Sequence, residues 1–215
     1  MKTWTVGILS QSVLAILFAT DAYSASPSTA TARLTLQSQP GDFIGGGQTI
    51  DFSYASSSLA ANISRTVGGQ PAYFSFSIGS PLTTPNTFST LAFGTDQLGL
   101  PMQLGTYNNA MRAAFATSGH PGLDVTFQNR GSNTLTGSFT VTDLDYYLDS
   151  SGVKQIDDFK VSFVQHSEGA TPALTGTFTY SAGVAPIPEP GTWVFGLSCL
   201  VVLSFGMRLR SRSQS

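Results

Sequence analysis

Hydrophobic residues recur at every second position in six stretches of the chain, with Ser, Thr, Asp or Lys between them. A period of two places alternate side chains on opposite faces of an extended strand, so the pattern predicts half-buried β-strands. Turn-forming residues separate the stretches, as in Gly68-Gly69-Gln70-Pro71 and Asp149-Ser150-Ser151-Gly152. The alternating residues are Leu34 and Leu36; Ile50, Phe52 and Tyr54; Phe74, Phe76 and Ile78; Leu123, Val125 and Phe127; Phe139 and Val141; and Phe159, Val161 and Phe163.

These strands predict one all-β domain over residues 25–183, folded as an antiparallel β-sandwich of jelly-roll-like type. The chain has 15 Phe, most of them at alternating positions, and these would fill the space between two layers. Within this domain residues 108–116 are the only helix candidate, and a strand is the competing interpretation there. Residues 135–140 and 174–179 have similar sequences, in which Gly137 and Gly176 would leave room for an aromatic neighbour or a bulge.

The first residues of the chain have the pattern of a secretory signal peptide. Lys2 precedes an apolar stretch over residues 6–18, and the small-residue site Ala22-Tyr23-Ser24 follows it. We expect a signal peptide over residues 1–24, and an uncleaved anchor is the alternative. Either segment would direct the body of the chain across the inner membrane.

A proline-rich stretch, an apolar run and a basic end follow the predicted β-domain. We expect a linker over residues 184–190 with the motif Pro188-Glu189-Pro190, a short transmembrane helix over 191–207 and a basic cytoplasmic tail over 208–215. The apolar run itself, from Trp193 to Met207, would form a helix of roughly 22 Å, against a hydrocarbon layer of about 30 Å. Arg208, Arg210 and Arg212 would act as the membrane stop, because positive side chains favour the cytoplasmic side. The alternative, a buried helix of a soluble domain, fits poorly with a run that is apolar on every face.

This three-part order resembles the PEP-CTERM sorting signal of Gram-negative bacteria, in which Pro-Glu-Pro precedes a short membrane helix and a basic end. In that family an exosortase, an integral-membrane processing enzyme, recognises the region around the motif. Its bearers are usually exported alongside exopolysaccharide systems. The resemblance implies an exosortase-type partner and anchoring in the inner membrane by the C-terminal helix. After processing it implies a location at the cell surface or outside the cell.

The composition of the residues between the two termini limits the kinds of partner that we expect for this domain. Acidic side chains outnumber basic ones there, and no basic patch occurs. Because phosphate binding needs such a patch, we do not expect nucleic acid as a partner. The only cysteine, Cys199, lies in the apolar run near the C-terminus. The exported domain therefore has no disulfide of its own, and its stability has to come from its core.

Residues 33–180 are similar to a secreted bacterial β-domain that has no assigned activity. The similar stretches include Pro40-Gly41-Asp42-Phe43-Ile44-Gly45-Gly46-Gly47, Arg130-Gly131-Ser132-Asn133-Thr134-Leu135-Thr136-Gly137 and Phe163-Val164-Gln165-His166-Ser167-Glu168-Gly169. In that pattern cysteines stand where this chain has Ser132 and Ser167. The resemblance therefore implies that these two serines lie close together, without the covalent link.

No arrangement of residues in the body demands a chemistry, and we predict no catalytic residues, no cofactor and no enzyme activity. His120 and His166 have polar neighbours, but neither has a second His at metal-ligand spacing. Asp143, Asp145 and Asp149 are candidate calcium ligands, because carboxylate oxygens suit that ion. The alternative is a charged hairpin face that discourages edge-to-edge pairing. Two Thr-x-Thr pairs, Thr140 with Thr142 and Thr177 with Thr179, are too few for the flat regular array that ice binding needs.

Taken together, the sequence predicts an exported surface or extracellular-matrix protein with a non-enzymatic structural role. The alternative function is a carbohydrate-binding module for exopolysaccharide, since β-sandwiches are common scaffolds for sugar binding and tyrosine rings can stack on sugars. The tyrosines considered for stacking are Tyr54, Tyr73, Tyr107, Tyr146 and Tyr147.

Overall fold

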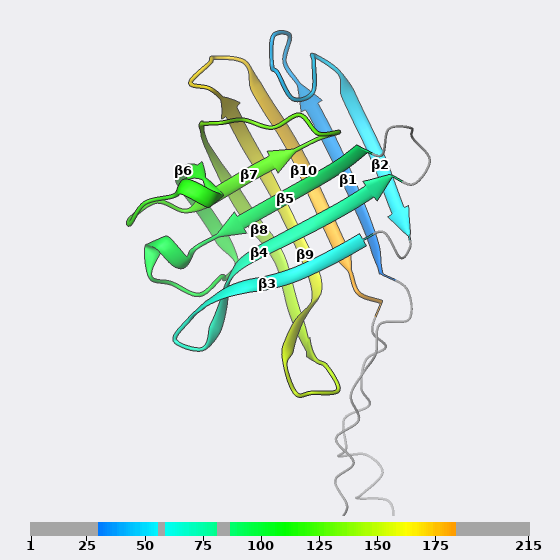
Figure 1. Cartoon of the computed structure of the whole chain (residues 1–215), viewed down its shortest axis with the longest axis vertical. Helices are drawn as coiled ribbons and strands as arrows, with labels where there is room; N and C mark the ends of the chain where they lie inside the picture. The colour runs from blue at the N-terminus through cyan, green and yellow to red at the C-terminus, as the bar shows by residue number, and fades with distance from the viewer. Residues whose placement is uncertain (1–29, 56–58, 81–86, 184–215) are drawn as a thin grey trace, which may run out of the picture.

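The computed structural model describes residues 30–55, 59–80 and 87–183, which form one ten-stranded sheet (Figure 1). The predicted signal peptide, the linker with Pro188-Glu189-Pro190, the membrane helix and the basic tail lie outside the described residues. Within the described ranges, no helix is long and apolar enough to cross a membrane.

The described part of the chain is all-β, with two short 3₁₀ turns between strands. The strands are β1 (Thr31–Ser38), β2 (Thr49–Ala55), β3 (Leu59–Val67), β4 (Gln70–Ser80), β5 (Thr87–Gly94), β6 (Gly105–Arg112), β7 (Gly122–Thr126), β8 (Leu135–Leu148), β9 (Lys154–Ser167) and β10 (Ala173–Ser181). The turns are η1 (Asp96–Leu98) and η2 (Ala113–Phe115). Across the sheet the order is β2-β1-β10-β9-β8-β6-β7-β5-β4-β3.

Each of the six alternating stretches lies in a strand, with Phe127 one residue past the end of β7. The helix candidate over residues 108–116 is instead the end of β6 followed by η2, because pairing of β6 with β8 overrides the local helix propensity. The prediction of a purely antiparallel sheet is wrong at one place. Strands β6 and β7 are parallel, so the sheet is mixed.

The sheet curls until it is nearly closed, and β4 and β5 cross β9 and β10 in Figure 1. Aromatic rings fill the space at the crossing: Phe76 on β4 lies 4.7 Å from Phe178 on β10 and 5.3 Å from Phe159 on β9, between ring centroids. Phe93 on β5 lies 5.4 Å from Phe139 on β8. All five rings are fully buried, which confirms that Phe builds the core. Each such burial contributes about 1.5–3 kcal/mol.

The two similar segments lie on β8 and β10, the strands on either side of β9. Gly176 on β10 is opposite Phe163, and a Cβ added at Gly176 would lie 2.5 Å from Cζ of that ring and 2.6 Å from the carbonyl oxygen of Thr35. The prediction that Gly176 makes room for an aromatic neighbour is confirmed. At Gly137 a Cβ would instead collide with the carbonyl oxygen of Val164.

Candidate functional site

The outward side chains of β1, β10, β9, β8 and β6 form a row of hydroxyl groups across five neighbouring strands. Pairing in register places Thr35 beside Thr177, Thr177 beside Ser162, Ser162 beside Thr140, and Thr140 beside Thr106. The row arises because each of these residues alternates with a core residue, as Thr35 does between Leu34 and Leu36. We call this outer surface, together with the two rows described next, the hydroxyl face.

Two further rows lie above and below the central row. One consists of Gln37, Thr175, Val164 and Ser138, and the other of Arg33, Thr179, Lys160 and Asp143. Strand β2 extends the face at its edge with Thr49, Asp51 and Ser53, which pair with Gln37, Thr35 and Arg33. Three of the four threonines in the two Thr-x-Thr pairs, Thr140, Thr177 and Thr179, therefore belong to a larger array than the sequence alone indicated.

The hydroxyl face is hollowed rather than flat. An open hollow of about 570 Å³ lies over the central row, where Thr35, Ser162 and Thr177 line it. A second hollow of about 480 Å³ lies over the charged row, where Arg33, Lys160 and Thr179 line it. A hollowed surface suits a chain-like or ring-like ligand better than a planar crystal face.

Several polar groups on the hydroxyl face are available to a ligand. Thr106 and Thr140 share a hydrogen bond of 2.9 Å between their Oγ1 atoms. The hydroxyls of Ser162 and Thr177 have no hydrogen-bond partner among the described residues. Each free hydroxyl can donate one hydrogen bond and accept two, so the middle of the row is the part most open to binding.

One ion pair borders the face. Nε and Nη2 of Arg33 donate to the two carboxylate oxygens of Asp51 at 2.9 and 2.7 Å. The hydrogen bond from Arg33 holds the pKa of Asp51 below its ordinary value, and the same bond raises the pKa of Arg33. Both side chains are more than half exposed, so the pair orients the two groups more than it stabilises the fold.

The five tyrosines considered for sugar stacking are not gathered on one surface. Tyr54, Tyr107 and Tyr146 pack against the core, and the ring of Tyr107 stacks on Phe139 at 4.9 Å. Burial raises the pKa of Tyr146 to about 12, which agrees with a ring held in apolar surroundings. Tyr73 lies on β4 beneath the guanidinium of Arg65, 4.6 Å from it. Stacking by this set therefore gains no support from the geometry.

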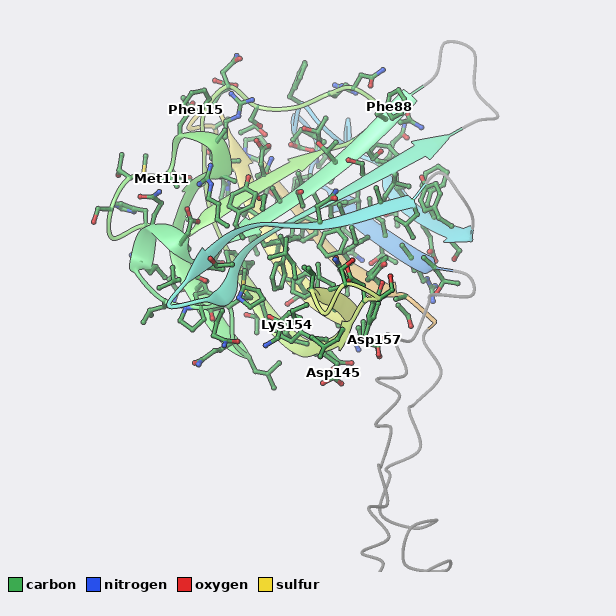
Figure 2. All side chains as sticks on the ribbon, turned by 60° about the horizontal axis from the view of Figure 1, so that its bottom comes forward. Phe88, Met111, Phe115, Asp145, Lys154 and Asp157 are labelled. Carbon is green, nitrogen blue, oxygen red and sulfur yellow. The ribbon has the colours of Figure 1, made fainter. Side chains whose placement is uncertain are left out.

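The acidic candidates for calcium are spread along the β8–β9 hairpin, and Figure 2 labels Asp145 at the lower edge of the coloured ribbon. Asp143 pairs with Lys160 across the strands. Asp149 closes the hairpin turn by accepting hydrogen bonds of 2.9 Å from the backbone N–H groups of Ser151 and Val153. The described residues contain no group of three acidic, His or Cys side chains that could hold a metal ion.

Both histidines support loops. Nδ1 of His120 lies 2.9 Å from the carbonyl oxygen of Asn109, a residue with φ of 57°. Nδ1 of His166 lies 3.0 Å from the carbonyl oxygen of Thr171 in the β9–β10 turn. The first imidazole thus contacts a carbonyl at the register shift of β6, and the second contacts a carbonyl in a turn.

Ser132 and Ser167 lie in contact inside the molecule, as the resemblance implied. Their Oγ atoms are 2.7 Å apart, and both residues are buried. The fully buried Gln165 supports them: its Oε1 accepts a bond of 3.0 Å from the N–H of Val125, and its Nε2 donates to the carbonyl of Val125 at 3.2 Å. Sequence reasoning missed Gln165. Its position in the sequence could have identified it, because Gln165 continues the alternation of Phe159, Val161 and Phe163, whose side chains point into the core.

A second contact joins the same two loops at the surface. The carboxylate of Glu168 accepts hydrogen bonds from the backbone N–H of Asn133 and from the N–H and hydroxyl of Thr134. These bonds, with the N–H of Asn133 first, lower the pKa of Glu168. Hydrogen bonds in the interior and at the surface thus hold these two loops together.

Comparison of the chain with protein-family models, with curated proteins and with solved structures finds no match.

Proposed function

We propose that this is an exported surface or extracellular-matrix protein with a non-enzymatic structural role, sorted by its C-terminal tail. The observation that carries the proposal is the order of Pro188-Glu189-Pro190, an apolar run, and Arg208, Arg210 and Arg212. An exosortase-type enzyme is the partner that this order implies. The signal peptide pattern at residues 1–24 supports the same direction of export.

A β-domain with a core of buried aromatic rings suits a structural role outside the cell. We infer that the curled sheet acts as a two-layer sandwich, because Phe76 on one side of the crossing packs on Phe159 and Phe178 on the other. The two histidines and the carboxylates of Asp149 and Glu168 form hydrogen bonds to backbone groups. These contacts fit a structural role for the four side chains.

Replacement of Pro188, Glu189 and Pro190 by alanine tests the sorting proposal. The variant should stay in the inner membrane at full length, whereas the wild type should appear outside the cell in a shortened form. Pro186→Ala, just outside the motif, is the matched control and should be processed normally. Equal processing of the triple variant and the wild type would refute the assigned role of the motif.

A second candidate function is exopolysaccharide binding on the hydroxyl face. The support comes from the five-strand row of hydroxyls, from the hollow above it and from the second hollow over the charged row. Neighbouring strands lie about 4.8 Å apart, close to the length of one sugar unit in an extended chain. A chain lying across the strands could therefore meet a similar set of polar groups at each step.

Hydroxyl deletion tests this binding. Thr177→Val and Ser162→Ala remove the free hydroxyls with little change in shape, and each should weaken binding to the exopolysaccharide of the producing cell. Loss of one neutral hydrogen bond costs about 0.5–1.5 kcal/mol, or roughly 2- to 12-fold in affinity. Thr90→Val, at an exposed position on β5, is the control. An equal loss with Thr90→Val, or no saturable binding at all, would rule out this face.

A further inference from the structure

We propose that β2 pairs with β2 of a second copy of this chain, antiparallel, so that two sheets join edge to edge. This inference concerns assembly and does not depend on glycan binding or on tail sorting. It rests on the free edge of β2, on the contrast with the other edge of the sheet, and on a register in which β2 complements itself.

Strand β2 is the first strand of the sheet, and no described strand lies beyond it. The N–H of Ser38 at the end of β1 donates to the carbonyl oxygen of Gln48 at 3.0 Å. The direction of the backbone N–H and C=O groups alternates along a strand. The groups of Ile50 and Phe52 therefore also face β1, whereas those of Asp51 and Ser53 point away from the sheet. Among the described residues no strand pairs with these groups, so this edge presents its donors and acceptors to another strand.

The opposite edge of the sheet is protected, whereas β2 is not. Strand β3 has register shifts on both sides of Arg65, and Asp96 binds that side chain at 2.7 Å. Bulges and charges of this kind discourage pairing with another chain. Strand β2 has seven consecutive regular pairs with β1, no proline and no lysine. Its single charge, Asp51, is already paired with Arg33.

The sequence of β2 is complementary to itself about its midpoint. With Phe52 opposite Phe52 of the second copy, all seven residues overlap, and Ile50 lies opposite Tyr54. Phe52 is 37% exposed at this edge, and the new pair would cover it. Phe52 falls at a non-hydrogen-bonded position on the free side, where facing side chains come closest.

Charge favours the same register. In the register centred on Phe52, Asp51 of one copy lies opposite Ser53 of the other, so the two carboxylates do not face each other. Centring on Asp51 would place the carboxylates directly opposite, which is destabilising. The pairing is isologous, so it closes as a dimer of two-fold symmetry and does not propagate into a fibre.

Substitution of Ser53 tests both the edge and the register. Ser53→Asp would place a second carboxylate opposite Asp51 of the partner copy, and Ser53→Lys would place an opposite charge there. The full chain is purified in detergent, and its mass is measured by light scattering from micromolar to millimolar concentration. A dimer should form in the wild type, weaken at least several-fold in Ser53→Asp, and persist or tighten in Ser53→Lys.

Thermal unfolding of each variant shows whether the fold is intact, since Ser53 is exposed and neither substitution should lower the melting temperature by more than a few degrees. Asn62→Asp on β3 is the matched control and should leave the dimer unchanged. A monomer throughout the concentration range would overturn the proposal. So would a dimer that both Ser53 variants leave unaltered, because that dimer would use another surface, such as the membrane helix.

Discussion

The contact between Ser132 and Ser167 predicts that a disulfide can be introduced there and will stabilise the protein. The two positions are 35 residues apart in sequence with their Oγ atoms 2.7 Å apart, so cysteines at both should bond with little movement of the backbone. Closing a loop of that length contributes about 4 kcal/mol through the unfolded chain. Loss of the existing hydrogen bond offsets about 1 kcal/mol of this. The net gain of about 3 kcal/mol corresponds to a rise in melting temperature of roughly 6–12 °C.

The assay compares Ser132→Cys/Ser167→Cys under oxidising and reducing conditions, in a Cys199→Ser background that removes the only native thiol. Mass spectrometry of peptides establishes the bond, and calorimetry gives the melting temperature. Ser132→Cys alone is the control and should show no redox-dependent change. Free thiols persisting in the double variant after oxidation would refute the placement of the two loops. A bond that forms but lowers the melting temperature would refute the energetic argument.

Two further predictions concern the core and acid stability. Gly176→Ala should destabilise the domain by about 1–3 kcal/mol, because the added Cβ meets Phe163 and a backbone oxygen. Thr177→Ala, at the next residue, is the control and should change the stability little. Urea unfolding measures both variants, and equal effects would contradict the packing argument. The folded pKa of Glu168 is lowered, so its contribution to stability is present above its unfolded pKa of about 4.3 and is lost as the pH falls through the folded value. Glu168→Gln should therefore flatten the fall in melting temperature below about pH 4.5, and an unchanged slope would contradict this.

Alternation predicted strands well where large apolar residues mark one face. It failed where the inward residues are small or mixed. Strand β3 turns Leu59, Ala61 and Ile63 toward the core, and the intervening alanine weakens the signal. The inward residues of β5 begin with a buried serine, Ser89. Strand β5 nevertheless carries an apolar pair at the expected spacing, Leu91 and Phe93, in its second half.

The candidate site could not be read from the sequence, because it depends on which strands are neighbours. Thr35 and Thr177 are 142 residues apart, yet they are adjacent in the sheet. The hydroxyl row exists only when the registers of five strands are combined. The parallel pairing of β6 and β7 is likewise a result of the whole topology. The contact between Ser132 and Ser167 does not follow from the hydrophobic pattern either, and only the resemblance to a secreted β-domain implied it.

The most direct test of the account is the intact mass of the protein recovered separately from medium, inner membrane and cytosol. Export with tail processing predicts a form in the medium that begins at residue 25 or 26 and ends near Pro190, with an Arg-bearing form confined to the inner membrane. Full-length protein dissolved in the cytosol, with both termini uncut, would contradict the central claim.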